Sequence, residues 1–294
     1  MFIHDFKYVK PKTLKEVHAF LNQQYPIAKV LAGGTDLFVR MERGLNPGFL
    51  IDIKGLGLDY CRLEEGVLQI GATATLSSLL TNPIVKKRAI PLWEAIDVMA
   101  SVQVRNRATI GGNLCNAAPS ADIFPPLSVL EAELVIANDD CVRKISVDEF
   151  CYGPGKTTLK KGEILTEILI PEMEENSAGA YCKYLRTAED IAISGVAAWF
   201  KLDTDNNCQH VRITLGAVGP TPLRAIAAES FLLGKEVCET NILQAAEIAS
   251  NEAKPIDDVR STAQYRKELI RVLTARALRT ALSRCSNNIQ GGLE

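Results

Sequence analysis

Two short glycine-centred segments carry the residue types that bind an anionic ligand. The first reads Lys29-Val30-Leu31-Ala32-Gly33-Gly34-Thr35-Asp36, and the second reads Ala108-Thr109-Ile110-Gly111-Gly112-Asn113. Glycine has no Cβ atom, so backbone N–H groups at each Gly-Gly pair can converge on a phosphate. Neither pair is followed by the lysine that a nucleoside-triphosphate P-loop requires. Together the segments predict a dinucleotide that is bound and not hydrolysed.

Each segment also has a plainer interpretation. The first fits a pyrophosphate cradle at the positive end of a helix, and it fits equally a tight strand-to-helix turn. It does not match Gly-x-Gly-x-x-Gly, which disfavours a conventional Rossmann site. In the second, Thr109 and Asn113 offer hydrogen bonds to phosphate or sugar oxygens, and Asp122 offers an acceptor to a ribose hydroxyl. The alternative there is a surface loop of turn residues.

The elements around the first segment form a compact nucleotide-binding unit. A short buried strand is predicted over residues 29–32, and it ends in the glycine turn. Thr35 or Asp36 is then available to cap a helix over 37–43. A second strand is predicted over 49–53. This order of strand, glycine turn, helix and strand is typical of nucleotide binding.

Hydrophobic periodicity predicts the elements of the remaining chain. Helices are expected over 14–21, with Thr13 as N-cap, and over 76–80, 91–100, 242–252 and 262–282. Strands are expected over 67–72, 134–137, 163–171, 180–185, 193–202 and 210–217. Residues 101–122 are rich in Asn, Gly, Ala and Pro, so they are predicted to form a long functional loop.

Composition indicates an ordinary globular protein. A net charge of −2 favours neither nucleic acid nor an anionic membrane surface. The first residues lack the basic and apolar regions of a signal peptide, and no apolar run is long enough to span a membrane. The chain is therefore predicted to be cytoplasmic.

The cysteines predict neither a metal site nor a structural disulfide. Eight are present, but no two are spaced as Cys-x-x-Cys, and three histidines offer few further ligands. An iron–sulfur cluster would need thiolates close together in loops. In a cytoplasmic protein such cysteines are expected to be reduced and mostly buried.

The glycine motifs belong to a wider pattern that covers essentially the full chain. Ala-Gly-Gly-Thr-Asp at 32–36 and Thr-Ile-Gly-Gly-Asn at 109–113 are followed by Asn-Ala-x-Pro-x-x-Asp at 116–122. Further matching segments are Gly-Pro-Gly-Lys at 153–156, Glu-Ile-Leu at 163–165 and Glu-Asp-Ile-Ala at 189–192. On these motifs the chain resembles the FAD-binding (medium) subunit of the molybdenum hydroxylase family, most nearly that of bacterial xanthine dehydrogenase. The carbon monoxide dehydrogenase flavoprotein is similar.

The resemblance implies an α+β fold in three parts. Two small subdomains of the PCMH or vanillyl-alcohol-oxidase type, here residues 1–55 and 56–173, are expected to enclose an extended FAD. A C-terminal α+β domain with a three-stranded sheet and helices is expected over 177–294.

The resemblance also implies roles for individual residues. Asp122 would hold the ribose or ribityl region, and Leu165 would pack near the adenine or ring system. Lys183 would lie near the flavin, although the alternative for it is a surface lysine on a strand, and Ile191 would cover one flavin face. FAD is expected to bind non-covalently, because neither glycine segment contains a histidine. The residues expected to wrap the diphosphate are Lys29, Val30, Leu31, Ala32, Gly33, Gly34, Thr35, Asp36, Thr109, Ile110, Gly111, Gly112 and Asn113.

The implied function is electron transfer within a larger complex. A molybdopterin-binding subunit would oxidise the substrate, and an iron–sulfur (ferredoxin-like) subunit would carry electrons to the FAD on this chain. NAD or another acceptor would then receive them. One alternative is a stand-alone flavin oxidoreductase of the same fold, which would need its own acid/base pair. A second alternative is a non-catalytic flavin-binding protein.

Overall fold

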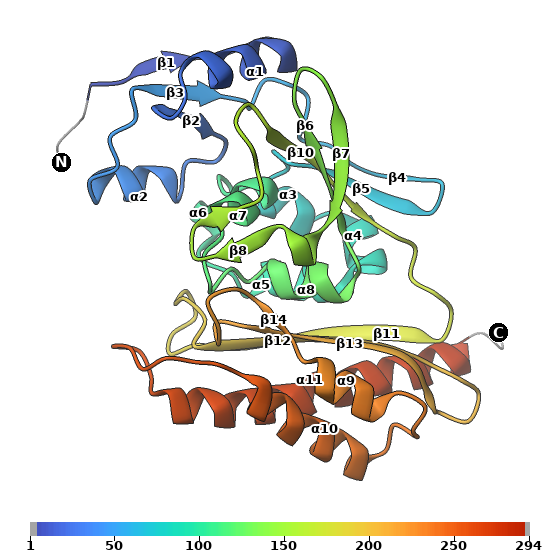
Figure 1. Cartoon of the computed structure of the whole chain (residues 1–294). Coiled ribbons are helices and arrows are strands. Elements are labelled where there is room, and N and C mark those ends of the chain that lie inside the picture. Colours follow the sequence, from blue (N-terminus) through green and yellow to red (C-terminus); the bar gives the residue numbers. More distant parts are fainter. Residues whose placement is uncertain (1–4, 292–294) are drawn as a thin grey trace.

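The computed structural model describes residues 5–291, with side chains to residue 285, and contains three main sheets that follow one another along the molecule (Figure 1). The predicted domains 1–55 and 177–294 include residues 1–4 and 292–294, which lie outside the described residues. None of the described helices is long and apolar enough to cross a membrane.

The first sheet is parallel and has the strand order β1-β3-β2. Helix α1 begins as predicted, because the Thr13 Oγ1 accepts a hydrogen bond from the Glu16 backbone N–H at 3.2 Å. Helix α2 also forms, with Asp36, one of the two residues expected there, at its N-cap position, although the Asp36 side chain makes no capping hydrogen bond. The elements are β1 (Lys7–Val9), α1 (Leu14–Gln23), β2 (Ala28–Leu31), α2 (Leu37–Glu42) and β3 (Phe49–Asp52).

The second sheet is antiparallel, with the order β4-β5-β10-β6-β7. Alternate residues of β5, β6 and β10 face helices on one side of the sheet, and there they form the largest hydrophobic cluster of the described residues. A short hairpin, β8 (Cys151–Gly153) with β9 (Lys156–Thr157), follows a 3₁₀ turn. The other elements are β4 (Cys61–Glu64), β5 (Val67–Gly71), α3 (Leu76–Leu80), α4 (Pro83–Arg88), α5 (Ile90–Asp97), α8 (Phe124–Val129), β6 (Glu133–Ala137), β7 (Val142–Ser146) and β10 (Ile164–Ile170).

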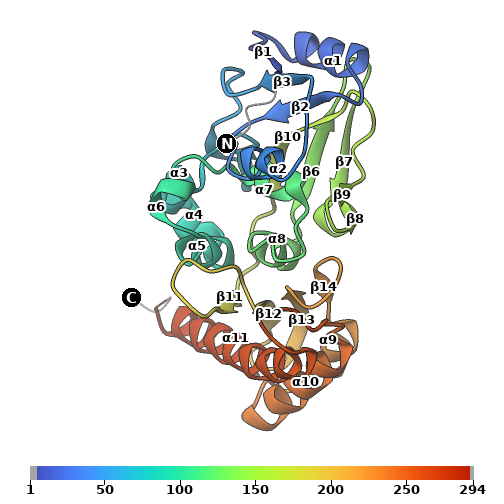
Figure 2. The ribbon, with the colours of Figure 1, turned by 90° about the vertical axis from the view of Figure 1, so that its left-hand side faces the viewer.

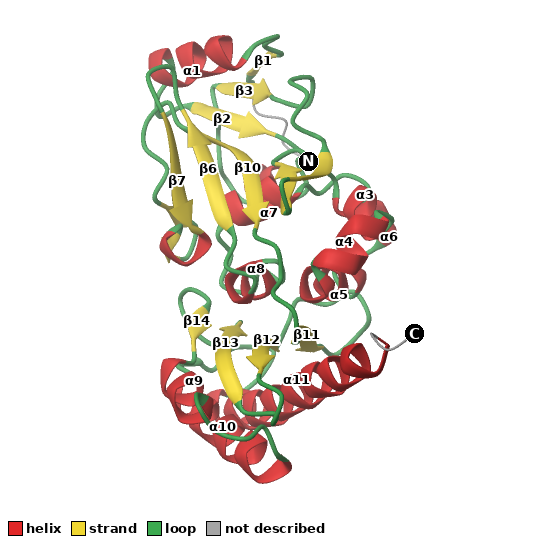
Figure 3. Cartoon of the chain, turned by 90° about the vertical axis from the view of Figure 1, so that its right-hand side faces the viewer, coloured by secondary structure: helices red, strands yellow, loops and turns green. Residues whose placement is uncertain are grey.

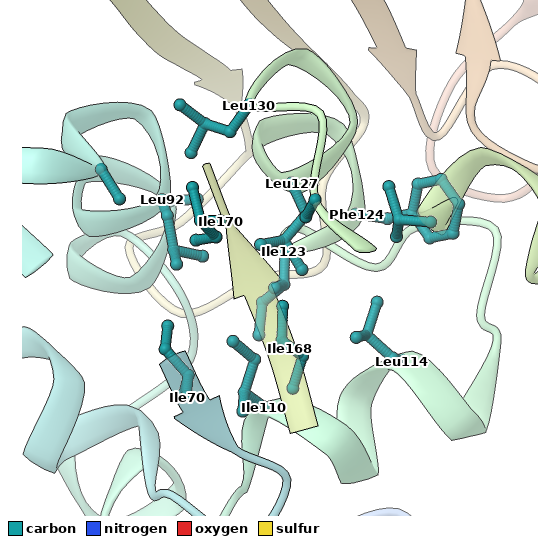
Figure 4. Packing of buried hydrophobic residues seen from close by; sticks show 14 of the residues in the cluster. Ile70, Leu92, Ile110, Leu114, Ile123, Phe124, Leu127, Leu130, Ile168 and Ile170 are labelled. Carbon is teal, nitrogen blue, oxygen red and sulfur yellow. The ribbon is translucent and has the colours of Figure 1, made fainter. Parts of the chain in front are cut away.

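The predicted long loop over residues 101–122 is wrong, because two short helices form within it. They are α6 (Val102–Arg105) and α7 (Ile110–Asn116). Helix α7 contains both glycines of the second motif, and its apolar residues Ile110 and Leu114 are buried in the core around β10 (Figure 4). Packing therefore forms a helix whose sequence has little helical propensity.

The third sheet is antiparallel and forms the C-terminal part of the chain. Three long strands are present as predicted, and a two-residue strand, β14, adds a fourth to the expected sheet of three. Helices α9 to α11 cover one face of this sheet, and α5 and α8 lie against the other (Figures 2 and 3). The α+β class is confirmed. The elements are β11 (Ser177–Tyr184), β12 (Ser194–Leu202), β13 (Cys208–Gly216), β14 (Leu223–Arg224), α9 (Ile226–Leu232), α10 (Glu239–Glu252) and α11 (Ala263–Gly291).

Candidate functional site

A cavity of about 400 Å³ lies between the first and second sheets. Both glycine segments contribute to its wall, together with the segment that precedes β10. The structure thus brings two motifs that are far apart in sequence onto one site. The predicted residues that line it are Lys29, Val30, Ala32, Gly33, Gly34, Thr35, Asp36, Thr109, Gly111, Gly112, Asn113 and Leu165.

Close backbone approach explains why glycine stands at the first motif. A Cβ atom on Gly33 would lie 2.0 Å from the carbonyl oxygen of Arg107, just before the second motif. Gly34 has φ +81°, and a Cβ there would lie 2.6 Å from the Phe38 ring. The two motifs therefore meet backbone to backbone, and side chains larger than hydrogen would separate them.

The second motif forms the first turn of α7. Thr109 is its N-cap, and its Oγ1 accepts a hydrogen bond from the Gly112 N–H at 3.1 Å. A Cβ on Gly111 would lie 2.7 Å from Ala72, so α7 packs closely against the chain after β5. The Oδ1 of Asn113 is buried without a hydrogen-bond partner among the described residues. An amide oxygen only accepts hydrogen bonds, so in this state it suits a bound ligand that offers a donor such as a sugar hydroxyl.

The charges around the cavity suit an anion. Four cationic side chains line it, and Asp36 is the single carboxylate among its described lining residues. Burial raises the pKa of Asp36, and the nearby Arg40 guanidinium partly counteracts that rise. The field in the cavity is consequently positive. The cationic residues are Lys29, Arg40, Lys160 and Lys161.

Five predicted residues do not line this cavity. Leu31 and Ile110 are buried in the neighbouring cores instead. Ile191 lies in the turn between β11 and β12 and is 55% exposed. Asp122, which precedes α8, and Lys183 on β11 lie together elsewhere, where α8 meets the third sheet.

Asp122 and Lys183 form a buried ion pair. Their Oδ2 and Nζ atoms are 2.9 Å apart, and the Tyr181 hydroxyl donates to the Asp122 Oδ1, also at 2.9 Å. The Lys183 side chain is only 2% exposed, so the alternative of a surface lysine is wrong. Burial raises the pKa of Asp122, while Lys183 and Tyr181 act in the opposite direction.

Sequence reasoning missed several lining residues of the cavity. Leu21 and Tyr25 come from the end of α1 and the turn after it, and Leu159, Lys160 and Lys161 precede β10. No motif or spacing marks these residues, because tertiary packing alone brings the two segments together.

Family comparisons agree with this geometry. Residues 4–173 match the FAD binding domain in molybdopterin dehydrogenase, and residues 179–281 match the CO dehydrogenase flavoprotein C-terminal domain. The chain belongs to the FAD-binding subunits of the molybdenum hydroxylase family. This flavin subunit is thus an oxidoreductase component, and FAD is its cofactor.

Individual relatives cover nearly the whole flavin subunit. It is 36% identical over 284 residues to the carbon monoxide dehydrogenase medium chain of Hydrogenophaga pseudoflava, covering 96% of this chain and 98% of that one. It is 31% identical over 274 residues to the xanthine dehydrogenase FAD-binding subunit of Escherichia coli O157:H7, covering 90% and 92%.

Solved structures show the same fold. A chain of the Hydrogenophaga pseudoflava carbon monoxide dehydrogenase that lacks the Mo-pyranopterin moiety matches with a TM-score of 0.93 and 35% identity, covering 97% of this chain and 100% of that one. A chain of quinoline 2-oxidoreductase from Pseudomonas putida 86 matches with a TM-score of 0.91 and 31% identity, covering 97% and 99%. Within residues 5–291 of the flavin subunit, no group of three or more His, Cys, Asp or Glu could hold a metal ion.

Proposed function

We propose that this flavin subunit accepts electrons from an iron–sulfur subunit and passes them to NAD or another acceptor, while a separate molybdopterin-binding subunit oxidises the substrate. One observation carries the proposal: two glycine motifs meet backbone to backbone on a cationic cavity that suits a diphosphate. A xanthine dehydrogenase type of complex is supported by the motifs and by the Escherichia coli relative. The greater identity to the Hydrogenophaga subunit favours a carbon monoxide dehydrogenase type.

The proposed site assigns a role to each group of residues. The lining residues of the two glycine segments wrap the diphosphate, and Leu165 packs against the adenosine half. FAD, when bound, supplies hydride and single-electron chemistry, and the protein binds and orients it. We assign Lys183 and Ile191 to the flavin end. There Lys183, oriented by Asp122, would place a positive charge that stabilises the anionic reduced flavin.

The cradle is tested by adding a single methyl group. In Gly33→Ala the new Cβ meets the Arg107 carbonyl, which cannot move without displacing the second motif. We expect the purified variant to lose at least about tenfold in FAD affinity, corresponding to about 1.4 kcal/mol. Flavin absorption and titration of the stripped protein measure this loss.

Gly55→Ala is the matched control. Its nearest heavy atom would be the Lys10 Cε at 3.5 Å, which is ordinary contact, so flavin content should match the wild type. Full FAD occupancy in Gly33→Ala would contradict the diphosphate assignment.

The electron route is tested separately: mass spectrometry of co-purified chains should find an iron–sulfur subunit and a molybdopterin subunit, and their absence from the native complex would contradict it.

A further inference from the structure

The part of the cavity wall that precedes β10 has no regular secondary structure of its own. Residues 158–163 connect β9 to β10. Lys160 and Lys161 in this segment supply two of the four cations that line the cavity, and Leu159 and Gly162 line it beside them. A segment without a helix or strand keeps one position only where other groups hold it. The contacts of residues 158–163 therefore decide whether the two lysines face the cavity.

A single guanidinium ties both ends of this segment to the second sheet. Arg143 lies on β7, an outer strand of that sheet (Figure 3). Its Nε and Nη2 donate to the two carboxylate oxygens of Glu163 at 2.9 and 2.8 Å, and Nη2 also donates to the Thr158 carbonyl oxygen at 3.0 Å. Neither Arg143 nor Glu163 is among the described residues that line the cavity. The pair therefore acts on the wall from outside the ligand's reach.

Glu163 passes this constraint on to the lysines. Its carboxylate accepts a hydrogen bond from the Lys160 N–H at 2.7 Å, and its own N–H donates to the Lys160 carbonyl oxygen at 3.1 Å. The Glu163 side chain is 3% exposed. The hydrogen bond from Arg143 is the main cause that lowers the pKa of Glu163, so the carboxylate is charged at neutral pH. On the side of α1, the Nδ1 of His18 lies 2.9 Å from the Gly162 carbonyl oxygen.

We propose that Arg143 and Glu163 are positioning residues of the FAD site, which hold Lys160 and Lys161 at the cavity without contacting the cofactor. This inference rests on the proposed function, because it takes FAD as the ligand of the cavity. Loss of Arg143 acts in two ways. It frees both ends of the segment, and it leaves a buried carboxylate that attracts the neighbouring lysines away from the ligand.

The test measures the release of FAD from the purified, flavin-loaded full chain, followed by the rise in flavin fluorescence. Arg143→Met should release FAD about tenfold faster or more, because the lysines are no longer held beside the anionic ligand. Arg143→Met/Glu163→Gln removes the buried charge without restoring the bridge, so it should also release FAD fast. Arg143→Lys keeps one cationic donor and should lie between the wild type and Arg143→Met.

Salt dependence separates positioning from a general loss of stability. Raising KCl from about 0.05 to about 0.5 M screens the attraction between the two lysines and the phosphates, so release from the wild type should accelerate. In Arg143→Met this acceleration should fall to about half or less, because Lys160 and Lys161 contribute less to binding. A general loss of stability would leave the salt dependence unchanged.

Arg224→Met is the matched control. Arg224 and Glu229 form a similar pair, with Nε 2.7 Å from Oε1 and side chains 23% and 9% exposed, against 27% and 3% for Arg143 and Glu163. Arg224→Met should lose stability in urea, yet it should release FAD as the wild type does, since the pair lies outside the cavity lining.

Three results would overturn the inference: wild-type release from Arg143→Met, recovery of slow release in Arg143→Met/Glu163→Gln, or equal acceleration in Arg224→Met. If Arg143→Met retains no flavin, Arg143→Lys takes its place in the comparison, and wild-type release and salt dependence there would likewise overturn the inference. A wild-type protein that binds no FAD defeats the proposed function instead.

Discussion

At the scale of single residues, Asp122 and Lys183 form a buried ion pair outside the cavity. Both side chains are almost fully buried, at 8% and 2% exposure. Lys183→Met would leave the carboxylate buried without its counter-charge, which costs about 3–5 kcal/mol when one partner is removed. Urea unfolding at neutral pH measures this loss. The double variant Asp122→Asn/Lys183→Met should recover most of it, and equal losses in the single and double variants would contradict the prediction.

The same ion pair leads to a prediction about how the stability of Lys183→Met depends on pH. Burial raises the pKa of Asp122, and Lys183 works against that rise, so the folded-state pKa should increase further in Lys183→Met. A folded state with the higher pKa binds the proton more tightly than the unfolded chain. The stability deficit of the variant should therefore be greatest above that raised pKa and should shrink as the pH falls through it. A deficit that does not change with pH would contradict this account.

At the scale of elements, α7 depends on its cap. Two glycines within seven residues each cost about 1 kcal/mol of helix propensity, so capping and packing must hold the turn. Thr109→Val keeps the shape but removes the acceptor for the Gly112 N–H, and it should cost about 1 kcal/mol. Thr109→Ser should retain most of that stability. Thermal unfolding of the two variants tests this, and equal midpoints would contradict it.

Sequence patterns predict the elements that carry their own signal. The alternation of apolar residues marks β13, a continuous apolar run marks β12, and the threonine cap marks α1. The sequences of helices α7 and α8 argue against a helix, because α7 contains a glycine pair and α8 contains Pro125 and Pro126. Both are short and are helical because their side chains fill the core.

At the scale of the whole molecule, the candidate site is built from segments that only tertiary packing brings together. The glycine motifs could be recognised because each has the composition of an anion cradle. Tyr25 and Lys161 could not, because neither has a local pattern and α1 must pack against the segment before β10 to bring them into contact. Composition likewise cannot show that Lys183 is buried, since its partner Asp122 lies in another part of the chain.

The whole molecule also depends on the contact between its third sheet and the helices α5 and α8 that lie against it. Arg212 on β13 bridges this contact, with Nη1 2.7 Å from Glu131 and Nη2 2.6 Å from Asp148, and its side chain is 11% exposed. Hydrogen bonds to charged groups contribute about 1.5–3 kcal/mol. Arg212→Met should therefore raise the population of the separated state about tenfold or more.

Hydrogen exchange in α8 measures this separation, because every residue of that helix is buried and the helix packs against β12 and β13. Its amides should exchange about tenfold faster in Arg212→Met. Arg271→Met is the matched control, since Arg271 is 42% exposed and pairs with Glu268 within the same helix, so α8 should exchange as in the wild type. Unchanged exchange in Arg212→Met would show that the remaining contacts hold α8 against the third sheet without Arg212. Lys183 on β11 would then keep its place beside Asp122 without the Arg212 ion pairs.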